Sequence, residues 1–374
     1  MTRSNNLNKT FVLIISILCL ILYFVPSKFP NPQEGDNYIR TKALVTDVDN
    51  SYIIQRGIVK TGVQRVTIKI IDGIYRDQSI TTSNNLIGKL ELDKIFQVGE
   101  SAFVVITGDG TILTNANLID HYRLDVQTIL FFLFIILLLW FAGWTGAKAV
   151  LSFVFTILVL WKMLLPMFLL GYDPIISSIL AVCAITGAVT FLVAGVNKTG
   201  LSAFLGTISG ALAACLLSII FGHLFKIHGA VIPYSETLLN VGFSNINLTK
   251  IFLAGIFLAS SGAMMDVAMD ISVAVKELVE NNPQISKKEA IKSGFEVGKA
   301  VVGAMTTTLL LAYSSSFTGL MMVFIAQGTP YINILNLTYI SAEILHTLVG
   351  SIGVVLVAPF TAFLAGILLT KNEH

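Results

Sequence analysis

The sequence predicts a polytopic α-helical membrane protein with about eight spans and a small extracytoplasmic all-β domain inserted after the first span. Of its 374 residues, 55% are hydrophobic and only 12% are charged, and the mean hydropathy is +0.80. A soluble domain carries about 25% charged residues. This composition excludes a soluble globular protein and a disordered chain, and a net charge of +2 is too small to indicate a nucleic-acid partner.

The first predicted span covers residues 11–26 and follows two basic residues, Arg3 and Lys9. It is short enough to be a secretory signal, but no small-x-small cleavage site comes after it. We therefore expect residues 1–26 to form a cytoplasmic N-terminus and an uncleaved membrane anchor helix.

Residues 27–125 differ sharply from the rest of the chain, because they hold 11 of the 24 basic residues and most of the acidic ones. Short alternating runs recur there, separated by turn signals such as Asp49-Asn50 and Asn84-Asn85. The runs are residues 41–48, 52–55, 66–71, 79–82 and 102–106. This pattern predicts five or six short strands. A segment of this length suits a small closed or half-open β-barrel, which hides its strand edges.

A membrane-spanning helix needs roughly 20 mainly apolar residues. Residues 126–371 offer seven such segments, which with the anchor make eight spans. The seven are residues 126–142, 149–170, 174–194, 200–221, 250–275, 297–314 and 339–369. The apolar segment 317–327 has only 11 residues, so we expect an interfacial or re-entrant piece there.

Lysine and arginine residues in the short loops predict the orientation of the spans. With the N-terminus inside, ten basic residues lie in inside segments and two in short outside loops. The ten are Arg3, Lys9, Lys148, Lys198, Lys276, Lys287, Lys288, Lys292, Lys299 and Lys371, and the two are Lys226 and Lys250. This bias predicts a multi-pass protein of the cell membrane with both termini in the cytoplasm and the β domain outside.

The one sizeable cytoplasmic element is an elbow at residues 276–299. Asn281-Asn282-Pro283 ends the preceding helix, and Ser286 with Glu289 has the spacing of a capping box that opens a new helix. The elbow is either a connection that lies along the inner surface or a moving coupling element.

Ionisable side chains at membrane depth are the first candidates for function, because each costs at least about 2.5–3.5 kcal/mol on insertion scales. Asp266 and Asp270 are four residues apart and share one helix face. Two poorly solvated carboxylates this close are expected to titrate as a coupled pair, which would suit a proton relay. Alternatively, both lie hydrated at the cytoplasmic interface.

Lys162 lies well inside an apolar stretch, 13 residues from its inside end at Ala149. Its side chain either snorkels to the interface or pairs with a buried carboxylate, for which Asp266 is the best candidate.

Glu343 and His346 open the last span, and their spacing of three puts them on one helix face. Histidine titrates near neutral pH, so the two could serve a proton or substrate path. The alternative is a pair of interface anchors. Two residues without a third ligand do not indicate a metal site.

Thr306, Thr307 and Thr308 either bond to their own helix backbone, as threonines in membrane helices usually do, or face the Asp266 helix and carry protons through water. Gly206 and Gly210 form a Gly-x-x-x-Gly pattern that predicts close helix packing. The scattered cysteines, at positions 19, 183 and 215, indicate small buried hydrophobic residues rather than a disulfide framework or a metal site.

Motifs of hydrolases, redox enzymes and nucleotide-binding proteins are absent from the sequence. It contains no Walker lysine loop, no His-Glu-x-x-His, no Gly-x-Ser-x-Gly and no Cys-x-x-Cys. We therefore expect no enzyme, no metal and no cofactor.

The membrane region resembles the YibE/F family of bacterial membrane proteins. The resemblance rests on Gly262-Ala-Met-Met-Asp-Val-Ala-Met-Asp-Ile-Ser272, on residues 298–313, and on Glu343-Ile-Leu-His-Thr-Leu-Val-Gly-Ser-Ile-Gly353 with Pro359 behind it. It covers roughly residues 125–370, and the β domain also looks like the family's external domain. The family often shows Gly-Arg-Asp where this chain has Gly298-Lys299-Ala300, so no role for a carboxylate there is carried over. The resemblance implies no settled activity.

The layout is more distantly similar to that of SecD/SecF and other RND permeases. In those proteins a carboxylate on the helix before the elbow takes part in proton coupling. The similarity implies that Asp266 or Asp270 takes that place, with the three threonines facing it.

We therefore predict a permease-like membrane protein that couples the proton gradient to transport or to an extracytoplasmic task, with an unknown substrate. The alternative is a non-transporting receptor or docking protein that acts through its external β domain. The expected partner is the lipid bilayer, and a second membrane protein or further copies of the chain are open alternatives.

Overall fold

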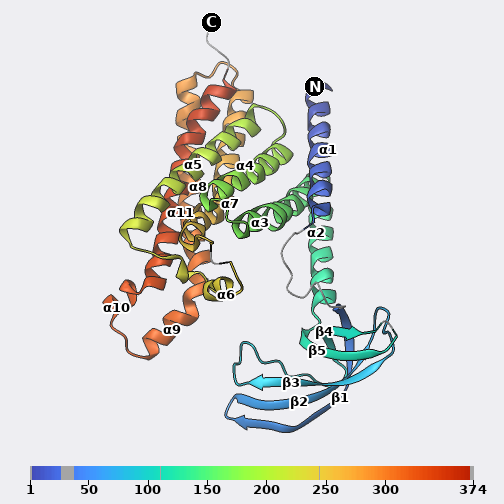
Figure 1. Cartoon of the computed structure of the whole chain (residues 1–374). Coiled ribbons are helices and arrows are strands. Elements are labelled where there is room, and N and C mark those ends of the chain that lie inside the picture. Colours follow the sequence, from blue (N-terminus) through green and yellow to red (C-terminus); the bar gives the residue numbers. More distant parts are fainter. Residues whose placement is uncertain (1, 27–37, 110, 244, 371–374) are drawn as a thin grey trace. The chain divides into compact units, whose positions relative to one another are not determined.

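The computed structural model describes residues 2–26, 38–109, 111–243 and 245–370 (Figure 1). The chain divides into two compact units, one of residues Lys28–Leu137 and one of Met1–Ser27 together with Leu138–His374. Residues 27–37 of the predicted β domain, and Lys371 of the charge count, lie outside the described residues.

Five antiparallel strands form the sheet in the described part of the Lys28–Leu137 unit, in the order β3-β2-β1-β4-β5. The strands are β1 (Ile39–Arg56), β2 (Val59–Ile70), β3 (Ser79–Ile87), β4 (Ser101–Gly108) and β5 (Leu113–His121). The hydroxyl of Thr82 on β3 donates a 2.6 Å hydrogen bond to the carbonyl oxygen of Ala116 on β5, which joins the two edge strands. The unit is therefore a small β-barrel-like domain, as predicted.

Two of the predicted turns are wrong. Asp49-Asn50 lies inside β1, where the pairing with β2 shifts register between Asp49 and Tyr52. The Asp49 carboxylate accepts hydrogen bonds from Ser51 there, so these polar residues mark a bulge rather than a turn. Asn84-Asn85 likewise lies inside β3. Conversely, β5 falls outside the predicted runs, because its asparagines and aspartate have low strand propensity.

The core of this domain comes from alternate positions along β1, β2 and β4, which face inward. The fully or almost fully buried strand residues are Ala43, Val45, Val66, Ile68, Ile70, Ala102, Val104 and Ile106. One polar side chain, Gln64, is also fully buried. Its Nε2 donates to the carbonyl oxygen of Phe96 at 2.9 Å, and its Oε1 accepts from the Phe96 N–H at 3.0 Å. These two bonds tie the connection between β3 and β4 to the sheet.

The helices account for most of the remaining described residues. They are α1 (Thr2–Phe24), α2 (Leu124–Leu158), α3 (Leu165–Leu169), α4 (Pro174–Val193), α5 (Lys198–Leu224), α6 (Ser235–Asn240), α7 (Leu248–Asn281), α8 (Lys287–Ser314), α9 (Thr318–Ala326), α10 (Tyr331–Asn336) and α11 (Thr338–Leu369). A π-helical turn, Val159–Leu164, joins α2 to α3. Within the described ranges, seven helical segments are long and apolar enough to cross a membrane.

The second of these segments, Leu124–Leu169, has 46 residues, which is long enough for two crossings. Gly143 breaks it with φ 54° and ψ −125°, a conformation that only glycine adopts readily. A Cβ at Gly146 would lie 2.4 Å from the carbonyl oxygen of Leu138, although eight residues of straight helix rise about 12 Å. The chain therefore turns sharply between the two stretches that were predicted as separate spans, 126–142 and 149–170.

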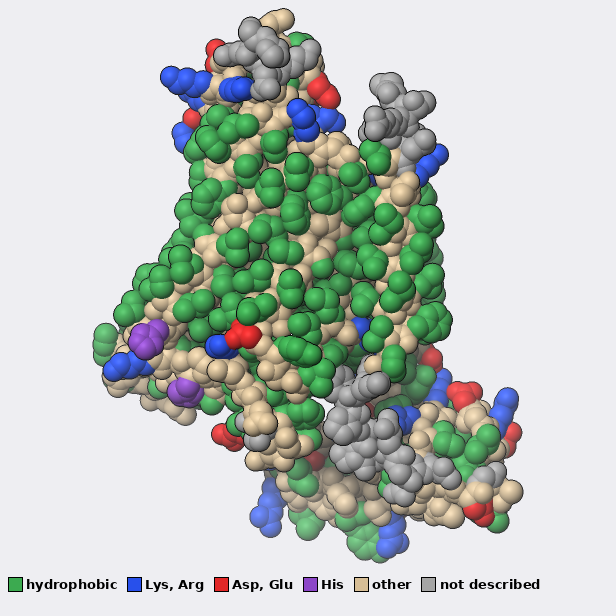
Figure 2. Space-filling model, turned by 45° about the horizontal axis from the view of Figure 1, so that its top comes forward, with side chains coloured by type: hydrophobic (Ala, Val, Ile, Leu, Met, Phe, Trp, Pro, Cys, Tyr) green, Lys and Arg blue, Asp and Glu red, His purple; other side chains and the backbone are tan. Residues whose placement is uncertain are grey.

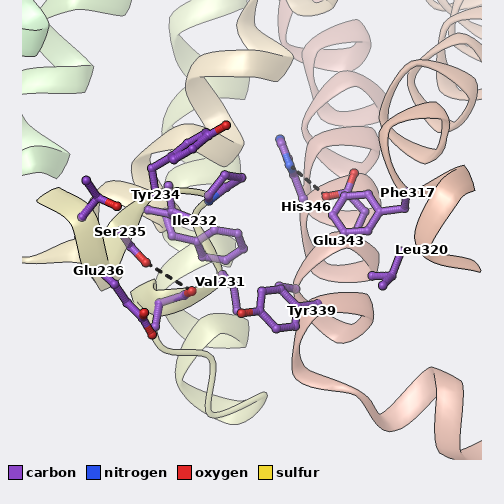
Figure 3. Close-up of a pocket in the computed structure, with 15 residues that line it drawn as sticks. Val231, Ile232, Tyr234, Ser235, Glu236, Phe317, Leu320, Tyr339, Glu343 and His346 are labelled. Atoms are coloured by element: carbon purple, nitrogen blue, oxygen red, sulfur yellow. Dashed lines mark hydrogen bonds and ion pairs between the residues drawn. The ribbon is translucent and has the colours of Figure 1, made fainter. Parts of the chain in front are cut away.

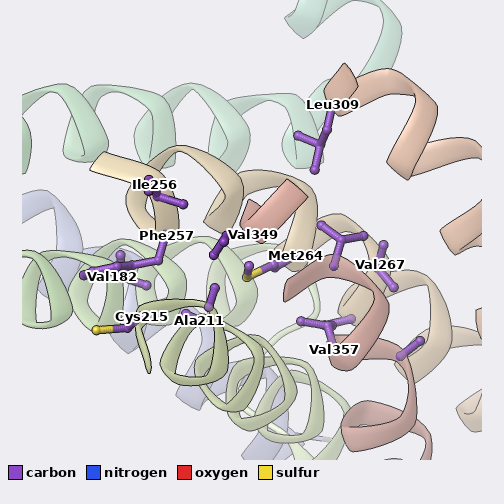
Figure 4. Packing of buried hydrophobic residues seen from close by; sticks show 14 of the residues in the cluster. Val182, Ala211, Cys215, Ile256, Phe257, Met264, Val267, Leu309, Val349 and Val357 are labelled. Carbon is purple, nitrogen blue, oxygen red and sulfur yellow. The ribbon is translucent and has the colours of Figure 1, made fainter. Parts of the chain in front are cut away.

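Helices α5, α7, α8 and α11 surround the main core of the helical unit. Figure 4 shows buried side chains of α5, α7 and α11 meeting there, among them Ala211, Met264 and Val357. A Cβ on Gly206 of α5 would lie 2.0 Å from Oγ1 of Thr361, and one on Gly210 would lie 2.0 Å from Cγ2 of Val357. The predicted close packing through Gly-x-x-x-Gly is thus confirmed.

A second hydrophobic cluster packs α1 against the end of α2, the π-helical turn and α4. It includes Ile15 of α1, Phe155 of α2 and Leu192 of α4. Cys19 belongs to this cluster and Cys215 to the main core. All three cysteines are free, and Cys183 is half-buried.

Polar residues before the long helices accept hydrogen bonds from their first N–H groups. Asp173 caps α4, Asn197 caps α5 and Asn247 caps α7. Ser286 and Glu289 form the predicted capping box at the start of α8. The break between α7 and α8 is confined to residues 282–286, so most of the predicted elbow 276–299 is continuous with the two long helices. The predicted short piece 317–327 contains the nine-residue helix α9.

Figure 2 shows one face of the molecule. Hydrophobic side chains cover the long helices on this face, and Lys and Arg side chains gather at the ends of the helices. Such a distribution is typical of helices that are surrounded by lipid.

Candidate functional site

A cavity of about 800 Å³ opens in the helical unit. Its wall consists of residues 230–237, Phe252 of α7, Phe317 and Leu320 around the start of α9, and the first turns of α11. In Figure 1, α6, α9 and α10 lie at the end of the helical unit away from α1's first turn and from the C-terminal end of α11.

Two of the predicted candidates, Glu343 and His346, line this cavity side by side. Both come from α11, whose neighbouring residues Ile340, Ala342 and Leu345 are buried and fix the orientation of the helix. The spacing of three therefore places both side chains on one face, as predicted.

The imidazole of His346 lies between a carboxylate and a phenol ring. Its Nδ1 is 3.7 Å from Oε2 of Glu343, the contact drawn as a dashed line in Figure 3. The ring of Tyr313 on α8 stacks on it, with centroids 4.3 Å apart and planes inclined by 27°. The side chains of His346 and Glu343 are only 20% and 16% exposed. In the described part of the chain, Nε2 of His346 is buried without a hydrogen-bond partner. A proton on this ring would convert the contact with Glu343 into an ion pair.

Several residues of the site were missed by sequence reasoning, because they come from separate loops and helices and share no local sequence pattern. Glu236 brings a second carboxylate to the cavity, and aromatic side chains complete its wall. These are Tyr234, Phe252, Phe317 and Tyr339. Tyr234 adopts φ 62°, which is uncommon for a residue with a side chain. The sequence signal that could have pointed to this part of the site is Tyr234 together with Glu236 in the connection between α5 and α7.

Asp266 and Asp270 share one face of α7, but that face points away from the core of the unit. Both are exposed on the isolated chain, whereas Met264, Val267 and Ile271 are buried. Asp266 follows Phe252, which lines the cavity, by 14 positions, or about 21 Å of helix. The structure therefore does not bring these carboxylates together with Glu343 and His346.

Lys162 lies on the π-helical turn and donates a 3.0 Å hydrogen bond to the carbonyl oxygen of Val25, directly after α1. Carbonyl groups at a helix C-terminus lack helical partners and attract a positive charge. Among the described residues, no ion pair joins Lys162 to Asp266, so the pairing considered for these two is not formed.

The three threonines of α8 bond to their own helix. Thr306 donates to Val302 at 3.0 Å, Thr307 to Gly303 at 3.5 Å and Thr308 to Ala304 at 3.1 Å. This is the first of the two predicted arrangements.

An ion pair outside the cavity fixes the neighbouring helix ends. The ammonium of Lys250, in the first turn of α7, lies against the Asp173 carboxylate that caps α4. The hydrogen bond from Lys250 holds the pKa of Asp173 below its usual value. No group of three or more His, Cys, Asp or Glu side chains that could hold a metal ion occurs in the part of the chain that the structure describes.

Comparison with known proteins identifies the family of the chain. The family described as YibE/F-like protein matches residues 130–371, which is more than half of the chain. Neither the curated proteins nor the solved structures contain a match. The family and the apolar helices together indicate a membrane protein. This chain belongs to the YibE/F family.

Proposed function

We propose that this protein is a permease-like membrane protein that couples the proton gradient to transport of a solute or to an extracytoplasmic task. The observation that supports this proposal most directly is the carboxylate–imidazole pair of Glu343 and His346 in the cavity. Imidazole and carboxylate groups are side chains that can bind and release protons, which is what a proton path requires. A cavity of about 800 Å³ also falls within the range of roughly 300–1,000 Å³ that small-molecule sites occupy.

The packing of α11 offers a route by which a charge change in the cavity could reach the rest of the bundle. This helix carries Glu343 and His346 and packs against α5, α7 and α8. Helix α7 in turn carries Asp266 and Asp270, our candidates for proton exchange at the other end of the path. A shift of α11 would therefore be transmitted to its three neighbours in the core, α5, α7 and α8.

Reconstitution into liposomes tests the proposal. Full-length protein is inserted into vesicles that enclose a pH-sensitive dye, and an inward proton gradient is imposed. We expect the wild-type protein to dissipate the gradient faster than the Glu343→Gln variant does. The variant keeps the shape of the side chain but cannot bind or release a proton. Equal rates for the two proteins, at equal incorporation, would contradict the proposal.

For the orientation we propose that both termini lie in the cytoplasm and that the β domain lies outside the cell membrane. The support is the excess of Lys and Arg in the inside segments, ten against two.

A second candidate function is docking or reception through the β domain. A groove of about 410 Å³ lies on the face of β1, β4 and β5. Its lining includes Arg40, Phe103, Asn115 and Asn117, which together offer charge, stacking and amide hydrogen bonds to a polar ligand. A Phe103→Ser variant that loses the biological role while Glu343→Gln keeps it would favour this candidate over the permease.

A further inference from the structure

The charged side chains that line the cavity are acidic. Its described lining contains the carboxylates of Glu236 and Glu343 and the imidazole of His346, but neither lysine nor arginine. With His346 neutral, these groups sum to a charge of −2. Lys226 and Lys250, which precede and follow the loop that carries Glu236, lie outside the lining, and Lys250 is paired with Asp173. The cavity therefore favours a positively charged occupant and disfavours an anion.

Aromatic rings form much of the remaining wall. Figure 3 shows Tyr234 and Glu236 on one side of the cavity and Phe317, Tyr339 and Glu343 on the other. The faces of such rings attract cations, and their edges and faces also pack against apolar surfaces. The wall thus matches an occupant that carries both a positive charge and an apolar body.

The size of the cavity further limits the class of ligand that it could bind. About 800 Å³ is far more than a bare metal ion needs, and the described residues place no three metal-ligating side chains together. The two carboxylates come from separate elements, α6 and α11, so they can contact a ligand from opposite sides.

We propose that this cavity binds organic cations that have an apolar, preferably aromatic, body. The assignment rests on the proposed function for its role in transport, but binding itself can be measured without any transport. The residues that recognise the ligand are Glu236 and Glu343 for charge, and Phe317 and Tyr339 for stacking.

Tetraphenylphosphonium is a suitable probe, because tetraphenylborate has nearly the same size and shape with the opposite charge. Equilibrium dialysis against the full-length protein in detergent measures both, with protein-free micelles subtracted. We expect saturable binding of tetraphenylphosphonium and none of tetraphenylborate. Glu236→Gln and Glu343→Gln should each weaken binding by about tenfold, which corresponds to roughly 1.4 kcal/mol for one lost charge contact.

Two further variants test whether the effects are specific to the cavity. Glu277→Gln removes an exposed carboxylate of α7 outside the cavity lining and should bind as the wild type does. Phe317→Leu keeps the charges and should weaken binding through the loss of the ring face. A thermal unfolding curve of each variant shows that the fold is kept.

The outcomes separate this inference from the proposed function. Equal binding of the two probes, or wild-type affinity in both Gln variants of the cavity, would overturn the cation site. If that happens while the wild type still dissipates a proton gradient, the permease proposal stands without it. Cation binding of the expected pattern without any proton movement would support the site and remove the permease proposal.

Discussion

Gly206 of α5 lies directly against Thr361 of α11. A Cβ added to Gly206 would come within 2.0 Å of the Thr361 hydroxyl oxygen and 3.1 Å of its Cα. Because the second atom belongs to the backbone of α11, rotation of the Thr361 side chain alone cannot make room. This contact therefore sets the distance between α5 and the helix that carries Glu343 and His346.

Gly206→Ala should destabilise the protein despite the better helix propensity of alanine. Overpacking of a close contact costs roughly 1–3 kcal/mol, and the thermal unfolding midpoint of the purified protein in detergent would fall accordingly. The matched control is Gly187→Ala on α4, where the nearest atom to the new Cβ is a ring carbon of Phe204 at 3.6 Å. That variant should be neutral or more stable by up to about 1 kcal/mol. Equal shifts for the two variants would disprove this account of the packing.

The parts of the fold that the sequence could predict are those encoded by short local patterns. Long apolar runs, Gly206 with Gly210, and Ser286 with Glu289 are local signals with a direct physical cause, and each predicted the correct local structure. The polar pair Asp49-Asn50 was misread, because a bulge and a turn use the same residues. Strand β5 was missed, because its residues have low intrinsic strand propensity and depend on pairing with β4.

The site was predictable only where two residues lie on one helix. The spacing of Glu343 and His346 placed them together, whereas Glu236, Tyr313 and Phe317 join them from elements far away in the sequence. No local pattern encodes such a meeting. For Lys162 the local signal was misleading. A charge in an apolar stretch suggested a carboxylate partner, whereas the structure provides a backbone carbonyl acceptor at Val25, after the end of α1.

A double-mutant cycle tests whether the side chains of Lys162 and Asp266 interact. Since Lys162 donates to the Val25 carbonyl oxygen and forms no ion pair with Asp266, removing it by Lys162→Met should leave no uncompensated charge at Asp266. The effects of Lys162→Met and Asp266→Asn on the free energy of unfolding should add within about 0.5 kcal/mol. A coupling energy well above that value would instead show that the two side chains interact.

The β domain should show a pH dependence that traces to Asp109. The N–H groups of Ile112 and Thr111 and the hydroxyl of Thr111 donate to its carboxylate and lower its pKa from 3.8 to about 2. A carboxyl group with a lowered folded-state pKa stabilises the fold above its unfolded pKa, and this contribution disappears as pH falls through the folded value. The difference in unfolding temperature between wild type and Asp109→Ala should thus be constant above about pH 5 and shrink between about pH 4 and 2. A difference that does not change over that range would refute the assignment.

Labelling of single cysteines tests the proposed orientation. In a chain whose three native cysteines are replaced, Asn85→Cys lies on β3 and Lys288→Cys on α8, and both positions are exposed. A membrane-impermeant maleimide added to intact cells should label the first and not the second. Permeabilised cells provide the control, because both positions should then react. Labelling of position 288 in intact cells would reverse the orientation.

Asp266 and Asp270 are predicted to differ in their effect on any proton-dependent activity. Counted from Lys250, whose partner Asp173 lies at the start of α4, the two residues are 16 and 20 positions along α7. These intervals correspond to about 24 Å and 30 Å of helix, against a hydrocarbon core of about 30 Å. If Lys250 marks one boundary of the membrane, Asp266 lies within the core and Asp270 at the opposite boundary.

Asp266→Asn should therefore abolish gradient dissipation in reconstituted vesicles, whereas Asp270→Asn should lower its rate less and Asp266→Glu should retain part of it. Asparagine has the shape of aspartate but cannot carry the proton, so expression and unfolding temperature should stay near those of the wild type. Glu277→Gln, on the same helix and exposed, is the control and should leave the rate unchanged. Wild-type behaviour of Asp266→Asn would remove the carboxylate from the proton path, and a loss of activity in both Asp266→Asn and Glu277→Gln would indicate damage to α7 instead. In the first case the groove of the β domain, with Arg40 and Phe103, becomes the better place to look for function.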